Sequence, residues 1–231
     1  PGKPLVEIIV TDDNPNGFAD LRDAFTLFAP SKKKADPELR GRFNLGEKLV
    51  LSLCDEATIA STKGTVRFGS NGLRTTSKAR LEVGSEFKGV MKMTRQEFAK
   101  ALAKLKSVVP PAGVRTLLVT DEETIELTRP EPVCTFEATL PTEVADSEGV
   151  MRRTYRKTKV EVFEPIGIAG IYEMGIPVVD TGDRYTVSIE QKVPLSMSRD
   201  NVTPSFLQDV RALVLNETSH LLTKEEATET W

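Results

Sequence analysis

Short apolar runs separated by turn residues characterise the first half of the chain. Residues 5–10 form an apolar, largely β-branched run that predicts a buried strand, and turn-forming residues from Asp12 to Gly17 follow it closely. The later runs are shorter and are separated by glycine turns, which predicts a meander of strands. We expect these strands at residues 57–61, 65–68, 73–76, 79–83 and 87–93.

Three segments carry apolar residues at the three- and four-residue spacing of an amphipathic helix. The first covers residues 18–28 and ends before Pro30. The second follows a capping box made by Thr94 and Glu97, and the third follows the N-cap residue Thr203. Their apolar faces consist of Phe18, Leu21, Phe25 and Phe28, of Phe98, Ala101, Leu102 and Leu105, and of Phe206, Val210, Leu213 and Val214.

A proline-rich break at residues 110–113 ends the second helix and is the expected domain boundary. Beyond it the chain is rich in strand patterns and closes with the third helix. These strands are expected at residues 114–120, 124–128, 133–140, 154–163 and 185–193. We therefore expect two domains, residues 1–110 and 111–231, in a chain of the α+β class.

The charge of the chain is nearly balanced, with 31 basic and 34 acidic residues and a net charge of −3. No global field therefore directs it to nucleic acid or to a membrane, although a local basic patch is compatible with these numbers. No apolar run reaches the ~18 residues that cross a bilayer and no signal peptide opens the chain, so we expect a cytoplasmic protein without a membrane partner. Cys54 and Cys134, with a single histidine, offer no metal-ligand spacing, and we interpret them as buried free thiols.

A glycine-bearing loop from Gly41 to Gly46 opens a short apolar helix. Backbone amides at such a helix start point at an anion, and the helix dipole reinforces them, which suits a triphosphate. Lys48, just inside this helix, either adds a positive charge to the phosphates or is a solvated lysine. The basic segment 31–42 before the loop shows no periodicity and is expected to be a mobile loop.

The order of these features resembles that of the GHKL, or Bergerat-fold, ATPase family of gyrase B, heat-shock chaperone, histidine kinase and MutL proteins. The order runs from an Asp–Gly turn after a strand, through a helix and a Ser-Lys basic loop, to a glycine loop that opens a helix. A Gly-Ser pair follows at residues 84–85. The resemblance implies a two-layer α/β sandwich (Bergerat fold) for residues 1–110 and a smaller, β-rich, transducer-like α+β domain for residues 111–231.

The adenine contact implied by this resemblance has two registers. In the family, an Asp-x-Gly-x-Gly box supplies a carboxylate that accepts a hydrogen bond from the adenine amino group. Asp13 and Gly17 match its first and last positions, with Pro15 in the place of the middle glycine. In the second register Asp12 contacts adenine and two asparagines replace the glycines, because Asn tolerates left-handed backbone angles. We slightly prefer Asp13 to Asp12.

The resemblance also implies contacts to the phosphates. Ser31 and Lys32 resemble the start of the family's ATP lid, and Gly41 and Gly46 resemble its second glycine box. The lid lysines are otherwise solvated charges. Ser85 resembles the hydroxyl residue that shares a water molecule with the adenine-binding aspartate, with a plain strand turn as the alternative.

Lys192 has the position in the chain of the family's transducer lysine, after a strand and before a loop and the final helix. In the family that lysine reaches the terminal phosphate of ATP. The resemblance therefore implies a γ-phosphate switch, and an edge-strand lysine is the alternative.

The family's catalytic residues have no match in the sequence. Family members hydrolyse ATP with a glutamate base and hold Mg²⁺ through an asparagine, both on a helix that precedes the Asp–Gly strand. No residues precede Pro1 to supply that helix, so we expect it in an upstream segment or expect a chain that does not turn over ATP.

These features predict an ATP-binding module, with Mg²⁺ as the implied metal, in which nucleotide closes the lid and drives association with a second copy. A protein or DNA partner is compatible with this role, and the sequence does not identify one. The alternative is a non-enzymatic interaction module, such as a phage or structural assembly protein with a degenerate nucleotide-binding fold. Pro15 and the missing catalytic helix favour that alternative.

Overall fold

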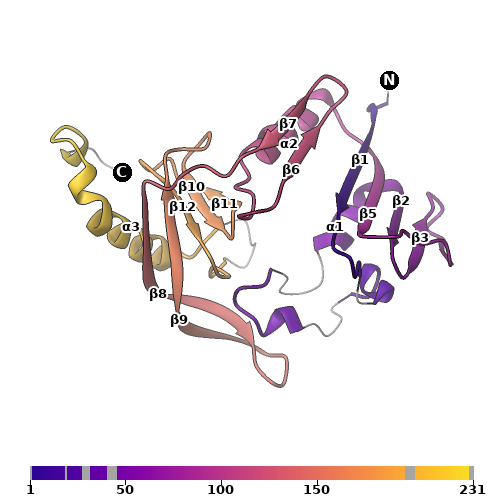
Figure 1. Ribbon diagram of the computed structural model, residues 1–231, viewed down its shortest axis with the longest axis horizontal. Coiled ribbons are helices and arrows are strands. Elements are labelled where there is room, and N and C mark those ends of the chain that lie inside the picture. Colours follow the sequence, from indigo (N-terminus) through magenta and orange to yellow (C-terminus); the bar gives the residue numbers. More distant parts are fainter. Residues whose placement is uncertain (1, 19, 28–31, 41–45, 196–200, 229–231) are drawn as a thin grey trace. The chain divides into compact units, whose positions relative to one another are not determined.

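The computed structural model describes residues 2–18, 20–27, 32–40, 46–195 and 201–228 (Figure 1). The chain forms two compact units. The first comprises Pro1–Ser31 and Gly41–Lys100, and the second comprises Lys32–Arg40 and Ala101–Trp231. A short segment of the N-terminal half thus belongs to the second unit. The boundary between the units lies after Lys100, before the proline-rich break at residues 110–113.

Five antiparallel strands form the sheet of the first unit, in the order β1-β5-β2-β3-β4. They are β1 (Leu5–Asp12), β2 (Cys54–Ser61), β3 (Gly64–Phe68), β4 (Arg74–Ser77) and β5 (Ser85–Lys92). The prediction of a strand at residues 79–83 is wrong. The amide of Leu81 donates to Ser61 O at 3.0 Å and the Thr65 hydroxyl donates to Ala79 O at 2.7 Å. These contacts hold the stretch beside the β2–β3 hairpin, but they do not form a strand ladder.

The helices of the first unit are shorter than the apolar spacing predicts. In the segment expected as a helix over residues 18–28, the described residues form only the 3₁₀ turn η1 (Leu21–Ala24), and Phe25 leaves the helical region at φ −134°. Asp20 caps this turn by accepting from the amide of Arg22. The guanidinium of Arg74 lies 3.7 Å from the centre of the Phe25 ring. Phe25 therefore packs under a cation from β4 rather than on a helix face.

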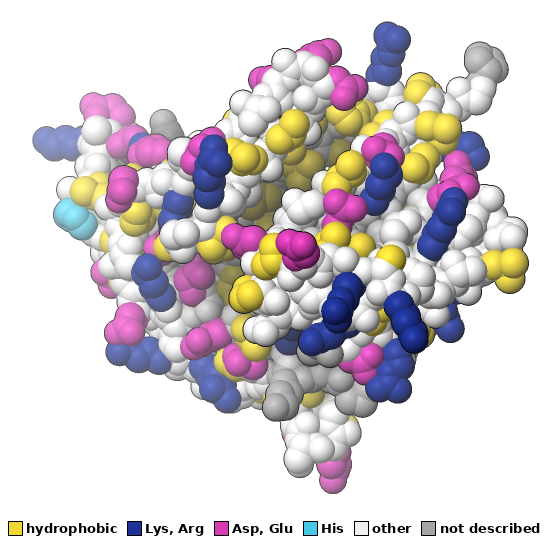
Figure 2. Space-filling view, turned by 45° about the vertical axis from the view of Figure 1, so that its right-hand side comes forward, with side chains coloured by type: hydrophobic (Ala, Val, Ile, Leu, Met, Phe, Trp, Pro, Cys, Tyr) yellow, Lys and Arg dark blue, Asp and Glu magenta, His cyan; other side chains and the backbone are white. Residues whose placement is uncertain are grey.

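The first unit encloses few apolar side chains. Its described buried hydrophobic residues are Ala24, Ala57, Ile59, Val66 and Met91. Large apolar side chains of β1 and of α1 (Gly46–Leu53) are instead more than half exposed, namely Leu5, Ile9, Val10, Leu49 and Leu53. The space-filling view accordingly shows hydrophobic side chains at the surface in several places (Figure 2). The limited burial indicates modest intrinsic stability for this unit.

The helix α2 (Arg95–Lys106) begins with the predicted capping box. The Glu97 carboxylate accepts from the amide of Thr94 at 2.7 Å, and the Thr94 hydroxyl accepts from the amide of Glu97 at 3.2 Å. Lys3 donates to the same carboxylate at 2.8 Å. The hydrogen bond from Lys3, followed by those from Thr94, lowers the pKa of Glu97 to about 2. The capping box is confirmed, whereas the apolar face of α2 contains no buried residue.

The low pKa of Glu97 predicts a small acid-dependent loss of stability. Because the folded pKa lies below the usual value of 4.5, its contribution is present above that value and disappears as the pH falls towards about 2. Glu97→Gln keeps the shape of the cap and removes the charge. Melting temperatures of the variant and the wild type should therefore differ at about pH 6 and converge near pH 2. An equal difference at both pH values would contradict the assignment.

The second unit contains a five-stranded sheet in the order β11-β10-β12-β9-β8, together with the β6–β7 hairpin. Its β10–β12 pair is parallel and the other pairs are antiparallel. The strands are β6 (Thr116–Val119), β7 (Thr124–Leu127), β8 (Cys134–Ala145), β9 (Met151–Phe163), β10 (Gly170–Glu173), β11 (Ile176–Asp180) and β12 (Thr186–Ile189). The five strands predicted in this half are confirmed, and β10 and β11 are additional.

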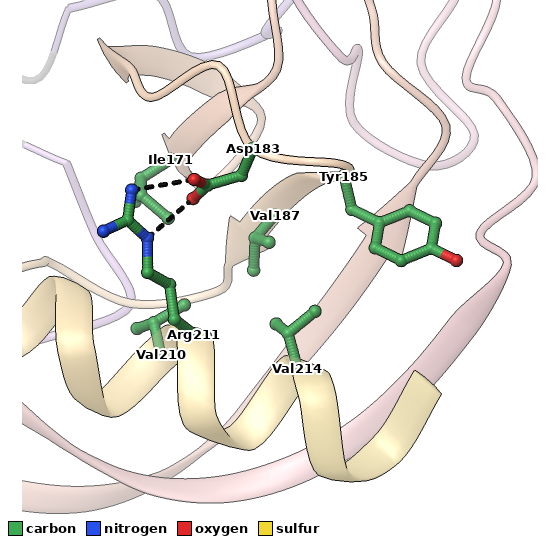
Figure 3. A pocket seen from close by; sticks show the side chains of 7 residues that line it. All are labelled: Ile171, Asp183, Tyr185, Val187, Val210, Arg211 and Val214. Atoms are coloured by element: carbon green, nitrogen blue, oxygen red, sulfur yellow. Dashed lines mark hydrogen bonds and ion pairs between the residues drawn. The ribbon is translucent and has the colours of Figure 1, made fainter. Parts of the chain in front are cut away.

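The helix α3 (Pro204–Thr218) covers this sheet with the apolar face that its spacing predicts. Phe206, Val210 and Val214 are buried, and they pack in the core of the second unit with residues of β9, β10 and β12. Arg211 donates to the two oxygens of Asp183 at 3.0 and 2.7 Å and so joins α3 to the segment before β12 (Figure 3). The cavity beside this pair measures about 10 Å³, which is room for one water molecule at most.

Mostly antiparallel sheets with few helices confirm the expected α+β class. Among the helices that the structure describes, none has the length and apolar character required to cross a membrane.

Candidate functional site

The turn after β1 places a carboxylate against a hydroxyl of β5. In the antiparallel register of the two strands, Asp12 lies opposite Ser85, and Ser85 in turn lies opposite Ser61 of β2. The Ser85 hydroxyl donates to Asp12 Oδ2, while Asp12 Oδ1 accepts from the amide of Asn14 at 3.0 Å. Both oxygens of the Asp12 carboxylate are therefore oriented by hydrogen bonds at the end of the sheet.

These contacts distinguish the two candidate aspartates. Asp13 is exposed, and among the described residues its side chain makes no hydrogen bond or ion pair. Asp12 accepts a hydrogen bond directly from the Ser85 hydroxyl, whereas the resemblance implies a hydroxyl that shares a water molecule with the adenine-binding aspartate. The structure thus distinguishes the two aspartates by their contacts, and the choice of the one that contacts adenine stays a prediction.

Two glycines allow the turn and β5 to approach each other. Gly84 has φ +79°, and a Cβ built on it would lie 1.9 Å from the carbonyl oxygen of Asp12. Gly17 has φ +55°, and its Cβ would lie 2.8 Å from the Thr62 hydroxyl and 2.9 Å from the Gly84 carbonyl. Only a residue without a side chain fits either position. The glycine predicted at position 17 is therefore required by a tertiary contact as well as by the turn.

The carbonyl of Asn14 holds this turn together. It accepts from the amides of Gly17 at 2.9 Å and of Gly84 at 3.1 Å. The Thr62 hydroxyl adds a hydrogen bond to Asn16 O at 2.8 Å. Asn14 was predicted only as a replacement for a glycine in the second register, and Thr62 was not predicted. The turn chemistry of Asn is visible in the sequence, but nothing local to Thr62 indicates its role.

The second glycine loop lies only partly within the described residues. Gly41 and the neighbouring Ser31 fall outside them, and Gly46 is the exposed first residue of α1. A Cβ on Gly46 would meet no atom within 4 Å. The Lys48 side chain is 8% exposed and its ammonium donates to Asp23 O, so Lys48 is not a solvated lysine.

Lys192 is fully buried and holds the segment that was predicted to form the lid. Its ammonium donates to the carbonyls of Lys33, of Lys34 at 3.3 Å and of Asp36 at 2.7 Å. Its amide donates to Pro37 O at 2.8 Å. Lys32 begins the 3₁₀ turn η2 (Lys32–Lys34) that presents two of these carbonyls. The alternative of an edge-strand lysine is wrong, because Lys192 follows the end of β12 (Thr186–Ile189) and its side chain is buried.

A buried carboxylate secures the other end of the same segment. Glu173 of β10 is 3% exposed and accepts from the amide of Val193 at 2.9 Å. Its second oxygen lies 3.8 Å from the guanidinium Nε of Arg40. Lys192 and Glu173 thus tie residues 33–40 to the second unit. Glu173 was not predicted, and its position in a short, unpredicted strand explains why.

The two cysteines lie in different units and form no disulfide. Cys54 and Cys134 are free, as predicted, but they are only partly buried and not fully buried. Burial, with Asp55 beside the first and Glu217 beside the second, raises the pKa of both thiols. In the described part of the chain no three His, Cys, Asp or Glu side chains are grouped as metal ligands would be.

No protein-family model and no curated protein matches the chain. Among solved structures, the crystal structure of the N-terminal domain of a DNA repair protein is similar to it, with a TM-score of 0.50 and 11% sequence identity. The similarity covers 96% of this chain and 86% of that chain. At this identity, it is a likeness of fold alone.

Proposed function

We propose that the chain is an ATP-binding module of the GHKL class, with Asp12 as the acceptor for the adenine amino group. The observation that carries the proposal is the hydrogen bond between Ser85 and Asp12 at the end of β1 and β5. A carboxylate has only acceptor oxygens and a hydroxyl can donate to one of them, so Ser85 orients Asp12 without neutralising it. The adenine amino group would supply the further donor.

Within this proposal the first unit is a two-layer sandwich, with the sheet as one layer and short helices as the other. Gly46 and the amides at the start of α1 would face the phosphates, because a helix N-terminus favours an anion. Residues 31–42 would act as the lid. Lys192 would exchange the carbonyls of residues 33–36 for the terminal phosphate and so report on its presence. Lid closure would then favour association with a second copy.

The proposal concerns binding and not turnover. The family's glutamate base and its Mg²⁺-holding asparagine have no assigned counterpart in residues 1–231. Mg²⁺ bound with ATP would neutralise phosphate charge, and we assign no residue of this chain to it.

Calorimetry with ATP tests the proposal and separates the two aspartates. Asp12→Asn keeps the side-chain shape and the acceptor for Asn14, but it lowers the charge that the adenine amino group would meet. A hydrogen bond to a charged group contributes about 1.5–3 kcal/mol, so ATP should bind the variant at least about tenfold more weakly. Asp13→Asn should bind within about twofold of wild type, because in this register Asp13 does not contact adenine.

Three outcomes of this experiment are informative. Loss of affinity in Asp13→Asn alone would move the adenine contact to the other register. Equal affinity of all three proteins would remove both aspartates from the site. Failure of the wild type to bind ATP, by calorimetry and by thermal shift, would end the proposal.

The alternative of a non-enzymatic interaction module is favoured by the exposed apolar side chains of β1 and α1, such as Ile9 and Leu53. Gly46→Phe distinguishes the two functions in the same assay. The Cβ position at Gly46 is open, so the fold should tolerate the ring while the phosphate approach is blocked. An interaction module should retain its partner in this variant, whereas an ATP switch should lose nucleotide.

A further inference from the structure

Basic residues are concentrated in one stretch of the first unit. Residues 57–81 contain five Lys or Arg residues and no Asp or Glu, although the whole chain has a net charge of −3. The five are Lys63, Arg67, Arg74, Lys78 and Arg80. The balanced composition therefore conceals a local excess of positive charge.

Two of these cations are engaged within the unit. Arg67 pairs with Glu56 at 2.9 Å, and the Arg74 guanidinium lies over the Phe25 ring at 3.7 Å. Lys63, Lys78 and Arg80 are exposed, and within the described residues they have no ion-pair partner. A single unpaired cation at the surface is usually only solvated. The arrangement of these three cations therefore decides whether they can form a binding surface.

The fold brings these three cations to the same end of the sheet. Lys63 lies in the turn between β2 and β3, and Lys78 and Arg80 follow β4. The Thr65 hydroxyl donates to Ala79 O at 2.7 Å, and the amide of Leu81 donates to Ser61 O at 3.0 Å. These contacts fix the segment after β4 beside the β2–β3 turn, so the cations are gathered by the tertiary structure.

An open groove of about 590 Å³ lies beside Lys63 and Arg80. It is lined by Pro15, Asn16, Thr62, Lys63, Arg80, Leu81 and Glu82. Glu82 is the acidic member of this lining. The adjoining strand β4 is exposed along its whole length and adds the hydroxyls of Thr75, Thr76 and Ser77. Hydroxyl and cationic donors are the groups that contact phosphate and sugar in nucleic-acid complexes.

We propose that this basic end of the sheet, defined by Lys63, Lys78 and Arg80, binds the phosphodiester backbone of a nucleic acid. Lys63 and Arg80 line the groove, and Lys78 with the exposed hydroxyls of β4 continues the surface beside it, which suits successive phosphates better than a single mononucleotide. The binding is independent of base sequence, because the surface offers phosphate contacts alone. It does not rest on the proposed ATP site.

Fluorescence anisotropy with a labelled mixed-sequence DNA duplex of about 20 base pairs tests the surface on the full chain at low salt. The variant is the triple substitution Lys63→Ala, Lys78→Ala and Arg80→Ala. The matched control is Arg95→Ala, Lys100→Ala and Lys224→Ala, which removes the same charge from exposed cations without an ion pair among the described residues. Both variants should melt like the wild type.

The surface triple should bind about 10- to 100-fold more weakly, and its slope of log affinity against log salt should fall by about 3, close to 0.9 per lost phosphate contact. The control should stay within about threefold of wild type. Equal weakening of both triples would assign the effect to net charge and overturn the proposal. So would a wild type that binds anionic vesicles but not DNA, or DNA binding that Asp12→Asn abolishes together with ATP binding.

Discussion

Lys192→Met is expected to release segment 33–37 from the second unit. Methionine keeps most of the length and volume of the side chain but supplies no donor, so the carbonyls of Lys33, Lys34 and Asp36 lose their shared partner. Leaving buried acceptors unsatisfied costs about 1–3 kcal/mol for each group. Detachment of the segment into water avoids that cost. The local change should therefore be larger than the change in global melting temperature.

Limited trypsin digestion measures this release, because Lys33, Lys34 and Arg40 are cleavage sites on the segment itself. Cleavage there should be at least about tenfold faster in Lys192→Met than in wild type, since about 1.4 kcal/mol of local opening corresponds to that factor. Lys224→Met, at an exposed position, is the control and should leave the cleavage rate unchanged. Unchanged cleavage in Lys192→Met would show that the ammonium does not hold the segment.

Gly84→Ala is expected to destabilise the first unit by about 3 kcal/mol or more. Alanine at φ +79° is strained, and its Cβ would stand 1.9 Å from the Asp12 carbonyl, so β1 and β5 must separate. Gly72 is the matched control, because its φ is +76° and a Cβ there meets no atom within 4 Å. Gly72→Ala should therefore report backbone strain alone, about 1–2 kcal/mol.

Hydrogen exchange on Gly84→Ala and Gly72→Ala separates the clash with the Asp12 carbonyl from the backbone strain. It reports on each unit and does not require a single two-state transition. In Gly84→Ala the amides of β1 and β5 should lose protection, while those of β8 and β9 keep theirs. The variant should also lose the orientation of Asp12 by Ser85 and with it any ATP affinity. A loss of protection no greater than in Gly72→Ala would mean that the close approach at Gly84 is easily relaxed.

Elements with long, regular patterns were predicted well. The strands β8 and β9 extend over 12 and 13 residues, and α3 buries Phe206, Val210 and Val214 as its spacing indicates. The cap at Thr94 and Glu97 forms because its partners are three residues apart. In each case the interactions that define the element lie within the element or alternate along it.

Elements with short patterns were predicted less well. Residues 79–83 have an apolar alternation but meet the side of the β2–β3 hairpin, through Leu81 and Thr65, where no strand ladder is offered. The spacing over residues 18–28 is helical, yet the guanidinium of Arg74 from β4 packs on the Phe25 ring. The described residues of this segment form a 3₁₀ turn instead of the expected helix. A local period cannot reveal which surface a segment meets.

In the candidate site, the turn after β1 follows from local residues, whereas its contact with β5 depends on the fold. Turn chemistry marks Asp12, Asp13 and Gly17, and the sequence slightly favours Asp13. The contact that distinguishes the aspartates depends on the register of β1 against β5, which joins Asp12 to Ser85 across 73 residues.

By itself the sequence determined the α+β class, the long strands and final helix, the α2 cap and the free thiols, because these follow from periodicity, neighbouring side chains or composition. Only the tertiary structure decided that Asp12 meets Ser85 and that Gly84 admits no side chain. It also decided that the Lys48 and Lys192 ammonium groups are buried against carbonyls of distant segments. The physical reason is that a side chain's partner is set by which backbones approach each other, and that approach depends on the packing of the whole unit.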